Sequence, residues 1–190
     1  MHEFGNTSEE ILARVAGRIF QDLVKEIFDF ARATGPSLSP FNAWVLSKSV
    51  ETLELRMLKH CENAMEVALW LEQQDGVTDV KYPFLQSHPQ YEVAKRQMSG
   101  GGAILSFKLE GGLAQGQRFL DAVEMCSLTA NLGDTRTIVS HPTSTTHAKL
   151  TEEERVAVGI TPGLVRISVG LEHPDDVIAD VRQALERSSA

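Results

Sequence analysis

The sequence has few of the residues on which several classes of protein depend. Only two cysteines, Cys61 and Cys126, occur in 190 residues, which excludes a disulfide framework. Both fall in or at the end of helical patterns, which favours reduced core thiols in a cytoplasmic protein. There is no C-x-x-C pair, and the spacing of His141 and His147 suits neither one helix face nor a zinc knuckle. We therefore expect no metal site.

Positive charge and long apolar runs are also scarce. Lysine and arginine number 18 against 26 aspartates and glutamates, which gives a formal net charge of -8. Because nucleic-acid binding needs a basic face, this charge argues against it. The apolar runs fall short of the roughly 18 residues that would suggest a membrane span. The segment Met1–Gly5 lacks the basic and apolar regions of a signal peptide, so we expect a cytoplasmic protein without membrane contact.

Motifs for nucleophilic catalysis and phosphate binding are missing as well. No G-x-S-x-G motif occurs, and the neighbours His60 and Cys61 would point apart on a helix. The run Gly100–Gly102 has neither the Walker ending nor the G-x-G-x-x-G spacing of a phosphate-binding loop. The motifs therefore assign no catalytic or cofactor-binding residue.

Two long helical patterns open the chain. Apolar residues recur at spacings of three and four over residues 7–33, and Thr7 with Glu10 has the spacing of a capping box. The second pattern continues without a break from Ser39 to Gln74 and is apolar over much of its circumference. We expect 39–74 to form one helix that is buried on more than one side and contacts another domain or subunit.

From residue 77 onward, strands and helices alternate. The periodicity predicts strands at 77–82, 103–109, 127–131, 137–140 and 164–171, and helices at 89–98, 113–125, 151–158 and 174–187. This order favours an α/β (α+β) fold, with two N-terminal helices and then a mainly antiparallel sheet that carries helices on one face.

The strand predicted at 164–171 carries a candidate binding group. Side chains alternate along a strand, so Arg166 and Ser168 share one face while Val165 and Ile167 share the other. A guanidinium on rigid β structure can bind a carboxylate through two parallel charge-assisted hydrogen bonds. The periodicity is also compatible with an alternative, in which Arg166 only faces solvent.

Several motifs, in order along the chain, resemble one enzyme family. They are Gly35–Ala43, Glu51–Leu53 with Arg56–Met57, Tyr82–Pro83, Pro89–Tyr91, Asn131–Asp134, His141–His147 and Leu164–Glu172. Together they resemble the C-terminal domain of the pyridoxal-phosphate enzymes of cysteine and methionine metabolism, from Phe30 to the end of the chain. Within this family, Gly35–Trp44 and Asn131 are most similar to the O-succinylhomoserine sulfhydrylases. Cystathionine γ-synthases and methionine γ-lyases are the alternatives.

The resemblance implies roles for two residues. Arg166 would hold the α-carboxylate of an amino-acid substrate, and Asn131 would help. The fold would be the C-terminal domain of a fold-type I pyridoxal-phosphate enzyme. By resemblance, a homoserine ester would be converted to homocysteine by γ-replacement with sulfide, in methionine biosynthesis and transsulfuration. Enzymes of this family form dimers of dimers, so the resemblance also implies a homo-oligomer.

The chain departs from the family in the part that holds the cofactor. The family's Schiff-base lysine lies in a Ser-x-x-Lys segment of a large N-terminal domain, and this sequence has no such segment. Its lysines are Lys25, Lys48, Lys59, Lys81, Lys95, Lys108 and Lys149. We therefore expect residues 35–190 to be the C-terminal domain without the large domain, preceded by a helix within 1–34 that matches the family poorly.

Two hypotheses follow from this departure. The chain is the C-terminal part of an O-succinylhomoserine sulfhydrylase-like enzyme. Alternatively, it is a catalytically inactive fragment or interaction module that associates with a full-length relative. Pyridoxal-phosphate chemistry needs a lysine for the Schiff base, so standalone activity would contradict both hypotheses.

Overall fold

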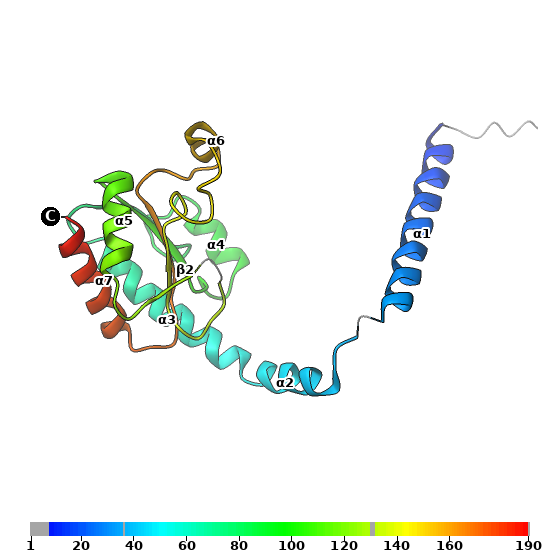
Figure 1. The fold of residues 1–190 in the computed structure, drawn as a ribbon, viewed down its shortest axis with the longest axis horizontal. Coiled ribbons are helices and arrows are strands. Elements are labelled where there is room, and N and C mark those ends of the chain that lie inside the picture. Colours follow the sequence, from blue (N-terminus) through cyan, green and yellow to red (C-terminus); the bar gives the residue numbers. More distant parts are fainter. Residues whose placement is uncertain (1–7, 36, 130–131, 190) are drawn as a thin grey trace, which may run out of the picture. The chain divides into compact units, whose positions relative to one another are not determined.

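A computed structural model describes residues 8–35, 37–129 and 132–189, with side chains from Val15 onward (Figure 1). The chain divides into two compact units, residues 1–50 and residues 51–190. Within the described residues, no helix is long and apolar enough to cross a membrane.

Unit 1 consists of two helices, α1 (Ser8–Thr34) and α2 (Pro40–Val50). Gly35 ends α1 with a positive φ of 62°, which glycine adopts without steric cost, and its N–H donates to the Ala31 carbonyl at 2.9 Å. Ser39 begins α2, because its Oγ accepts the Asn42 N–H at 3.2 Å. The predicted capping box cannot be followed, since Thr7 lies outside the described residues.

The prediction of one unbroken helix over 39–74 is wrong. The pattern divides into α2 and α3 (Leu53–Leu71), with a turn at Glu51 and Thr52. Thr52 has φ -108° and ψ 12°, outside the helical region. Threonine is β-branched and polar, and such residues are disfavoured in the interior of a helix. The spacing of the apolar residues nevertheless continues unchanged across the break.

Unit 2 is built on a five-stranded sheet in the order β1-β2-β5-β4-β3. The strands are β1 (Val77–Lys81), β2 (Ile104–Leu109), β3 (Ser127–Leu128), β4 (Ile138–Ser140) and β5 (Leu164–Ser168). Every neighbouring pair is antiparallel except β3 with β4, so the prediction of a mainly antiparallel sheet is confirmed. β3 and β5 are shorter than predicted. β5 ends at Ser168, beyond which Val169 and Gly170 are both buried.

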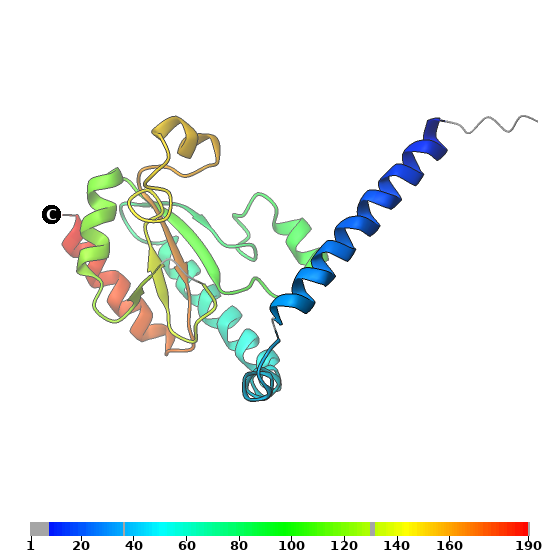
Figure 2. The ribbon, with the colours of Figure 1, turned by 45° about the vertical axis from the view of Figure 1, so that its right-hand side comes forward.

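Three helices cover one face of this sheet: α3, α5 (Gly112–Ala122) and α7 (Pro174–Ser188). Figures 1 and 2 show α5 and α7 side by side, with the short α4 (Tyr91–Gln97) away from them. Phe107 of β2 and Phe119 of α5 meet edge to face in the core, with ring centroids 5.9 Å apart. The remaining helix, α6 (Glu152–Ala157), starts with the predicted capping box of Thr151 and Glu154.

Asp180 of α7 ties this helix to the segment that leads into β3. Its carboxylate accepts the backbone N–H groups of Glu124, Met125 and Cys126, each at 2.9 Å. Burial alone would raise the pKa of Asp180, but the three backbone donors outweigh it, and the net pKa is lowered. A buried carboxylate therefore joins two layers of the fold.

Candidate functional site

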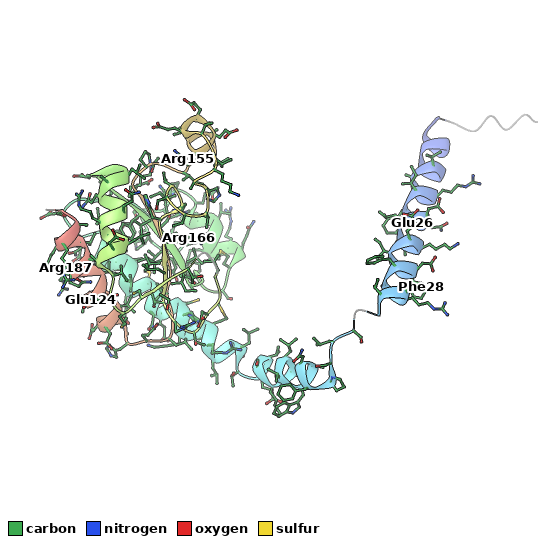
Figure 3. The ribbon with its side chains drawn as sticks, viewed as in Figure 1. Glu26, Phe28, Glu124, Arg155, Arg166 and Arg187 are labelled. Carbon is green, nitrogen blue, oxygen red and sulfur yellow. The ribbon has the colours of Figure 1, made fainter. Side chains whose placement is uncertain are left out.

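The open face of the sheet carries a row of three polar side chains across its central strands. Arg166 of β5 pairs in register with Ser106 of β2 and with Ser140 of β4. Residues directly opposite each other in antiparallel strands point to the same face, so the two hydroxyls flank the guanidinium. Figure 3 labels Arg166 near the middle of unit 2. Arg166 is half-buried rather than fully solvated.

The second predicted site residue, Asn131, lies outside the described residues. The segment that follows it directly, Leu132–Arg136, is described. Within this segment Arg136 binds Asp134 at 2.9 Å. The hydrogen bonds from the Arg136 side chain and backbone lower the pKa of Asp134 to about 2, so this exposed carboxylate is ionised at neutral pH.

A cleft of about 710 Å³ opens between α3, the glycine run before β2, this segment and β5. Its lining includes the apolar Leu53, Met57, Pro83, Ile104 and Leu132 and the polar Arg56, His60, Asp134 and Ser168. A largely apolar wall with a few convergent polar groups is the usual composition of a site for a small organic molecule. Ser168 shares the sheet face of Arg166, as the alternation predicted.

His60 of α3 is held in one orientation at this cleft. It is 8% exposed, and its Nδ1 donates to the Val169 carbonyl at 2.7 Å. With the proton on Nδ1, the other ring nitrogen of the neutral imidazole is an acceptor. The sequence singled out His60 only as a neighbour of Cys61 and did not predict this role.

His141 is a core residue. It is fully buried, donates from Nε2 to the Pro162 carbonyl at 2.7 Å, and accepts the Ser144 hydroxyl at Nδ1, 2.8 Å away. Burial lowers the pKa of His141, more than the hydrogen bond to Pro162 raises it, so the ring is neutral at pH 7. In the part of the chain that the structure describes, no group of three or more histidines, cysteines and carboxylates is placed to hold a metal ion.

The chain's own residues do not fit pyridoxal phosphate. The described lining of the cleft includes no lysine, and its cationic side chain is Arg56. Lys81 and Lys108 are paired with Asp79 at 2.5 and 2.6 Å, and Lys95 lies over the Phe84 ring. A Schiff base needs an available amine beside the substrate, and the described lining of this cleft supplies none.

The fold and this site define the class: a helix-covered, mainly antiparallel α/β domain whose open sheet face bears an arginine beside a cleft. A model of the Cys/Met metabolism PLP-dependent enzyme family matches residues 9–186. The chain belongs to this family, whose cofactor is pyridoxal phosphate, and the family prediction is confirmed.

Characterised relatives cover more than one activity. The chain is 49% identical over 171 residues to an O-succinylhomoserine sulfhydrylase of Pseudomonas aeruginosa. This match covers 90% of this chain and 42% of the relative. It is 44% identical over 168 residues to an L-methionine gamma-lyase of Porphyromonas gingivalis, at 87% and 42% coverage. The chain thus spans about two fifths of the length of these relatives.

The fold is shared with a solved structure of the same kind. A crystal structure assigned to an O-acetylhomoserine (thiol)-lyase of Campylobacter jejuni, which contains N'-pyridoxyl-lysine-5'-monophosphate, superposes with a TM-score of 0.78. The sequences are 39% identical, and the match covers 86% of this chain and 39% of the other. The expected C-terminal domain of a fold-type I enzyme is therefore confirmed as the fold class.

Proposed function

We propose that this chain is the substrate-binding C-terminal part of an O-succinylhomoserine sulfhydrylase-like enzyme of methionine biosynthesis, acting in the cytoplasm. The observation that carries the proposal is the position of Arg166. It lies on a central strand, half-buried, between the hydroxyls of Ser106 and Ser140. There the guanidinium would bind the α-carboxylate of a homoserine ester, with Asn131 as the predicted second contact.

Burial supports a binding role for this face over a solvated one. Ser140 is 3% exposed, and its Oγ has no hydrogen-bond partner among the described residues. An unsatisfied buried hydroxyl costs roughly 1–3 kcal/mol, so a polar face of this kind favours a polar ligand or water. The proposed ligand brings a carboxylate to this face.

The test is binding by the chain itself. Titration of the ¹⁵N-labelled protein with O-succinyl-L-homoserine should shift resonances around β5 and the cleft. Arg166→Leu should abolish those shifts, because the charge and both parallel donors are lost. Arg187→Leu is the matched control: Arg187 is a surface arginine of α7 paired with Glu124 (Figure 3), and this change should leave the shifts intact. Saturable shifts that survive Arg166→Leu would overturn the proposal.

A second candidate function is an inactive fragment or module that associates with a full-length relative. Unit 1 favours it, since α2 has no buried residue and exposes Phe41 and Trp44. Exposed apolar surface of this kind marks interaction sites. Sedimentation of the chain alone should then show a homo-oligomer. Sedimentation of the chain mixed with the purified Pseudomonas aeruginosa sulfhydrylase should show a mixed species.

Cofactor attachment separates these candidates from a self-sufficient enzyme. The chain is mixed with pyridoxal phosphate, reduced with borohydride, and its intact mass is measured. We expect no adduct, or scattered adducts on surface lysines. A single stoichiometric adduct on one lysine would show that the chain builds its own cofactor site.

A further inference from the structure

Two segments of unit 2 are joined by hydrogen bonds just beyond the end of β5. The Glu172 carboxylate accepts the Thr137 backbone N–H at 2.7 Å with one oxygen, and the Thr137 hydroxyl at 2.9 Å with the other. The same hydroxyl oxygen accepts the Gly170 N–H at 2.8 Å. The Leu171 N–H donates to the Thr135 carbonyl, also at 2.8 Å. We call the contacts among Glu172, Thr137 and Gly170 the β5 junction.

Helix α3 binds the same turn from the other side. Asn63 is fully buried, and its Nδ2 donates to the carbonyls of Gly170 at 3.0 Å and Glu172 at 2.8 Å. His60 donates to the next carbonyl back, that of Val169. The chain leaving β5 is therefore fixed to α3 through hydrogen bonds at three carbonyls, those of Val169, Gly170 and Glu172.

The junction leaves no room for adjustment. A Cβ on Gly170 would overlap the Glu172 carboxylate and the backbone of Thr135 and Arg136. Thr137 and Gly170 are both buried, and a charge-assisted hydrogen bond is stronger away from water. The spacing between β5 and the segment that enters β4 is consequently set by these contacts.

The joined elements are also walls of the cleft. Leu132 and Asp134 come from the segment before Thr137, His60 comes from α3, and Ser168 comes from the end of β5. The junction therefore lies where these walls meet. Arg166 is two residues before Ser168 on the same strand face, and Asn131 directly precedes Leu132 in the sequence.

We propose that Glu172 and Thr137 are positioning residues for the carboxylate-binding site, holding the segment 132–136 at a fixed distance from the strand of Arg166. The inference rests on the proposed function, because it concerns how the two sides of that site are placed. Neither residue is assigned a contact with the ligand. Their effect comes through preorganisation, since a displacement of about 1 Å at a binding group is enough to weaken recognition strongly.

The test compares two substitutions at one position. Thr137→Val keeps the shape but removes the hydroxyl, which leaves the Gly170 N–H and one Glu172 oxygen without their partner. Thr137→Ser restores the hydroxyl. We expect Thr137→Val to raise the Kd for O-succinyl-L-homoserine about tenfold through lost preorganisation, and Thr137→Ser to bind within about twofold of wild type. Thr78→Val, at an exposed position of β1, is the matched control and should not change the Kd.

A second readout separates positioning from general stability. In ¹⁵N relaxation, the amides of Leu132, Gly133 and Asp134 should gain motion in Thr137→Val and recover in Thr137→Ser. If Thr137→Val does not fold, Glu172→Gln takes its place. This change keeps one acceptor for the Thr137 N–H, and a several-fold weaker affinity is expected.

The outcomes distinguish this inference from the proposal beneath it. A wild-type chain without Arg166-dependent binding overturns the proposed function and the inference with it. Arg166-dependent binding whose Kd is unchanged in the folded Thr137→Val or Glu172→Gln variant overturns the inference alone. Weaker binding in Thr137→Val with recovery in Thr137→Ser supports both.

Discussion

Units 1 and 2 treat similar side chains in opposite ways. In α1, Phe20 and Phe28 are 68% and 63% exposed, whereas Phe107 and Phe119 of unit 2 are fully buried. Both units contain strongly amphipathic helices. The difference is that α3, α5 and α7 have a sheet face to cover, and α1 and α2 expose their apolar faces within unit 1. An amphipathic pattern thus specifies a helix and a buried face, but it does not specify what buries that face.

The difference between the two units is tested most strongly by truncating one phenylalanine in each unit. Phe107→Ala should lower the free energy of unfolding by about 3–5 kcal/mol, because it removes a buried ring and leaves a cavity against Phe119. Phe28 lies in α1 and is labelled in Figure 3. Phe28→Ala should change the free energy of unfolding by less than about 0.5 kcal/mol. Urea unfolding followed by far-UV circular dichroism measures both. An equal cost at the two positions would show that α1 is packed in solution.

The next largest effect concerns the carboxylate that joins two layers of unit 2. Asp180→Asn should lower the free energy of unfolding by about 1–3 kcal/mol at pH 7, because the three backbone donors lose a charged acceptor. Glu186→Gln, an exposed change on the same helix, is the control and should be close to neutral. Urea midpoints at fixed ionic strength give both values.

The pH dependence of this difference follows from the lowered pKa of Asp180. A carboxylate whose pKa is lower in the folded than in the unfolded state contributes stability above its unfolded pKa of about 3.9. That contribution is lost as the pH falls through the folded pKa. The gap between wild type and Asp180→Asn should therefore persist from pH 7 to pH 5 and close below pH 4. A gap that stays constant into acid would exclude the carboxylate as its source.

A smaller effect on stability is expected at α6, which is exposed like the helices of unit 1. Thr151→Ala removes the cap whose hydroxyl accepts the Glu154 N–H at 3.3 Å. Loss of such a cap costs about 1 kcal/mol of helix stability. Because α6 has no buried residue, the loss should appear as faster amide exchange in residues 152–157 with little change in global unfolding. Faster exchange throughout the sheet would contradict this locality.

The smallest effect is expected at the surface of α7. Arg187 and Glu124 form an ion pair at 2.7 Å, with side chains 60% and 64% exposed (Figure 3). A double-mutant cycle with Arg187→Ala and Glu124→Ala should give a coupling energy of about 0.2–1 kcal/mol at low salt. The coupling should weaken near 1 M salt, where the screening length falls to about 3 Å, close to the length of the ion pair. Coupling that is unchanged at high salt would mean that the pair is less solvated than its exposure indicates.

Much of unit 2 was predictable because its periodicity and its local hydrogen bonding agree. The alternation through Val165, Arg166 and Ile167 predicted which side chains share a sheet face. Thr151 and Glu154 predicted the start of α6 through contacts made within one turn. The family was predictable from the ordered motifs. In contrast, the break at Thr52 was missed because apolar spacing runs through it, and the backbone there departs from the helix without a glycine or proline to mark it.

The sequence alone was therefore enough to predict the kind of each element, the sheet face of Arg166, and the family. These properties depend on neighbours within a few residues or on sequence motifs that can be recognised without a structure. The register of Arg166 between Ser106 and Ser140, the cleft beside His60, and the junction of Glu172 with Thr137 were decided only by the tertiary structure. Their partners lie from 26 residues apart (Ser140 and Arg166) to 109 residues apart (His60 and Val169), and no local pattern encodes which distant group a side chain will meet.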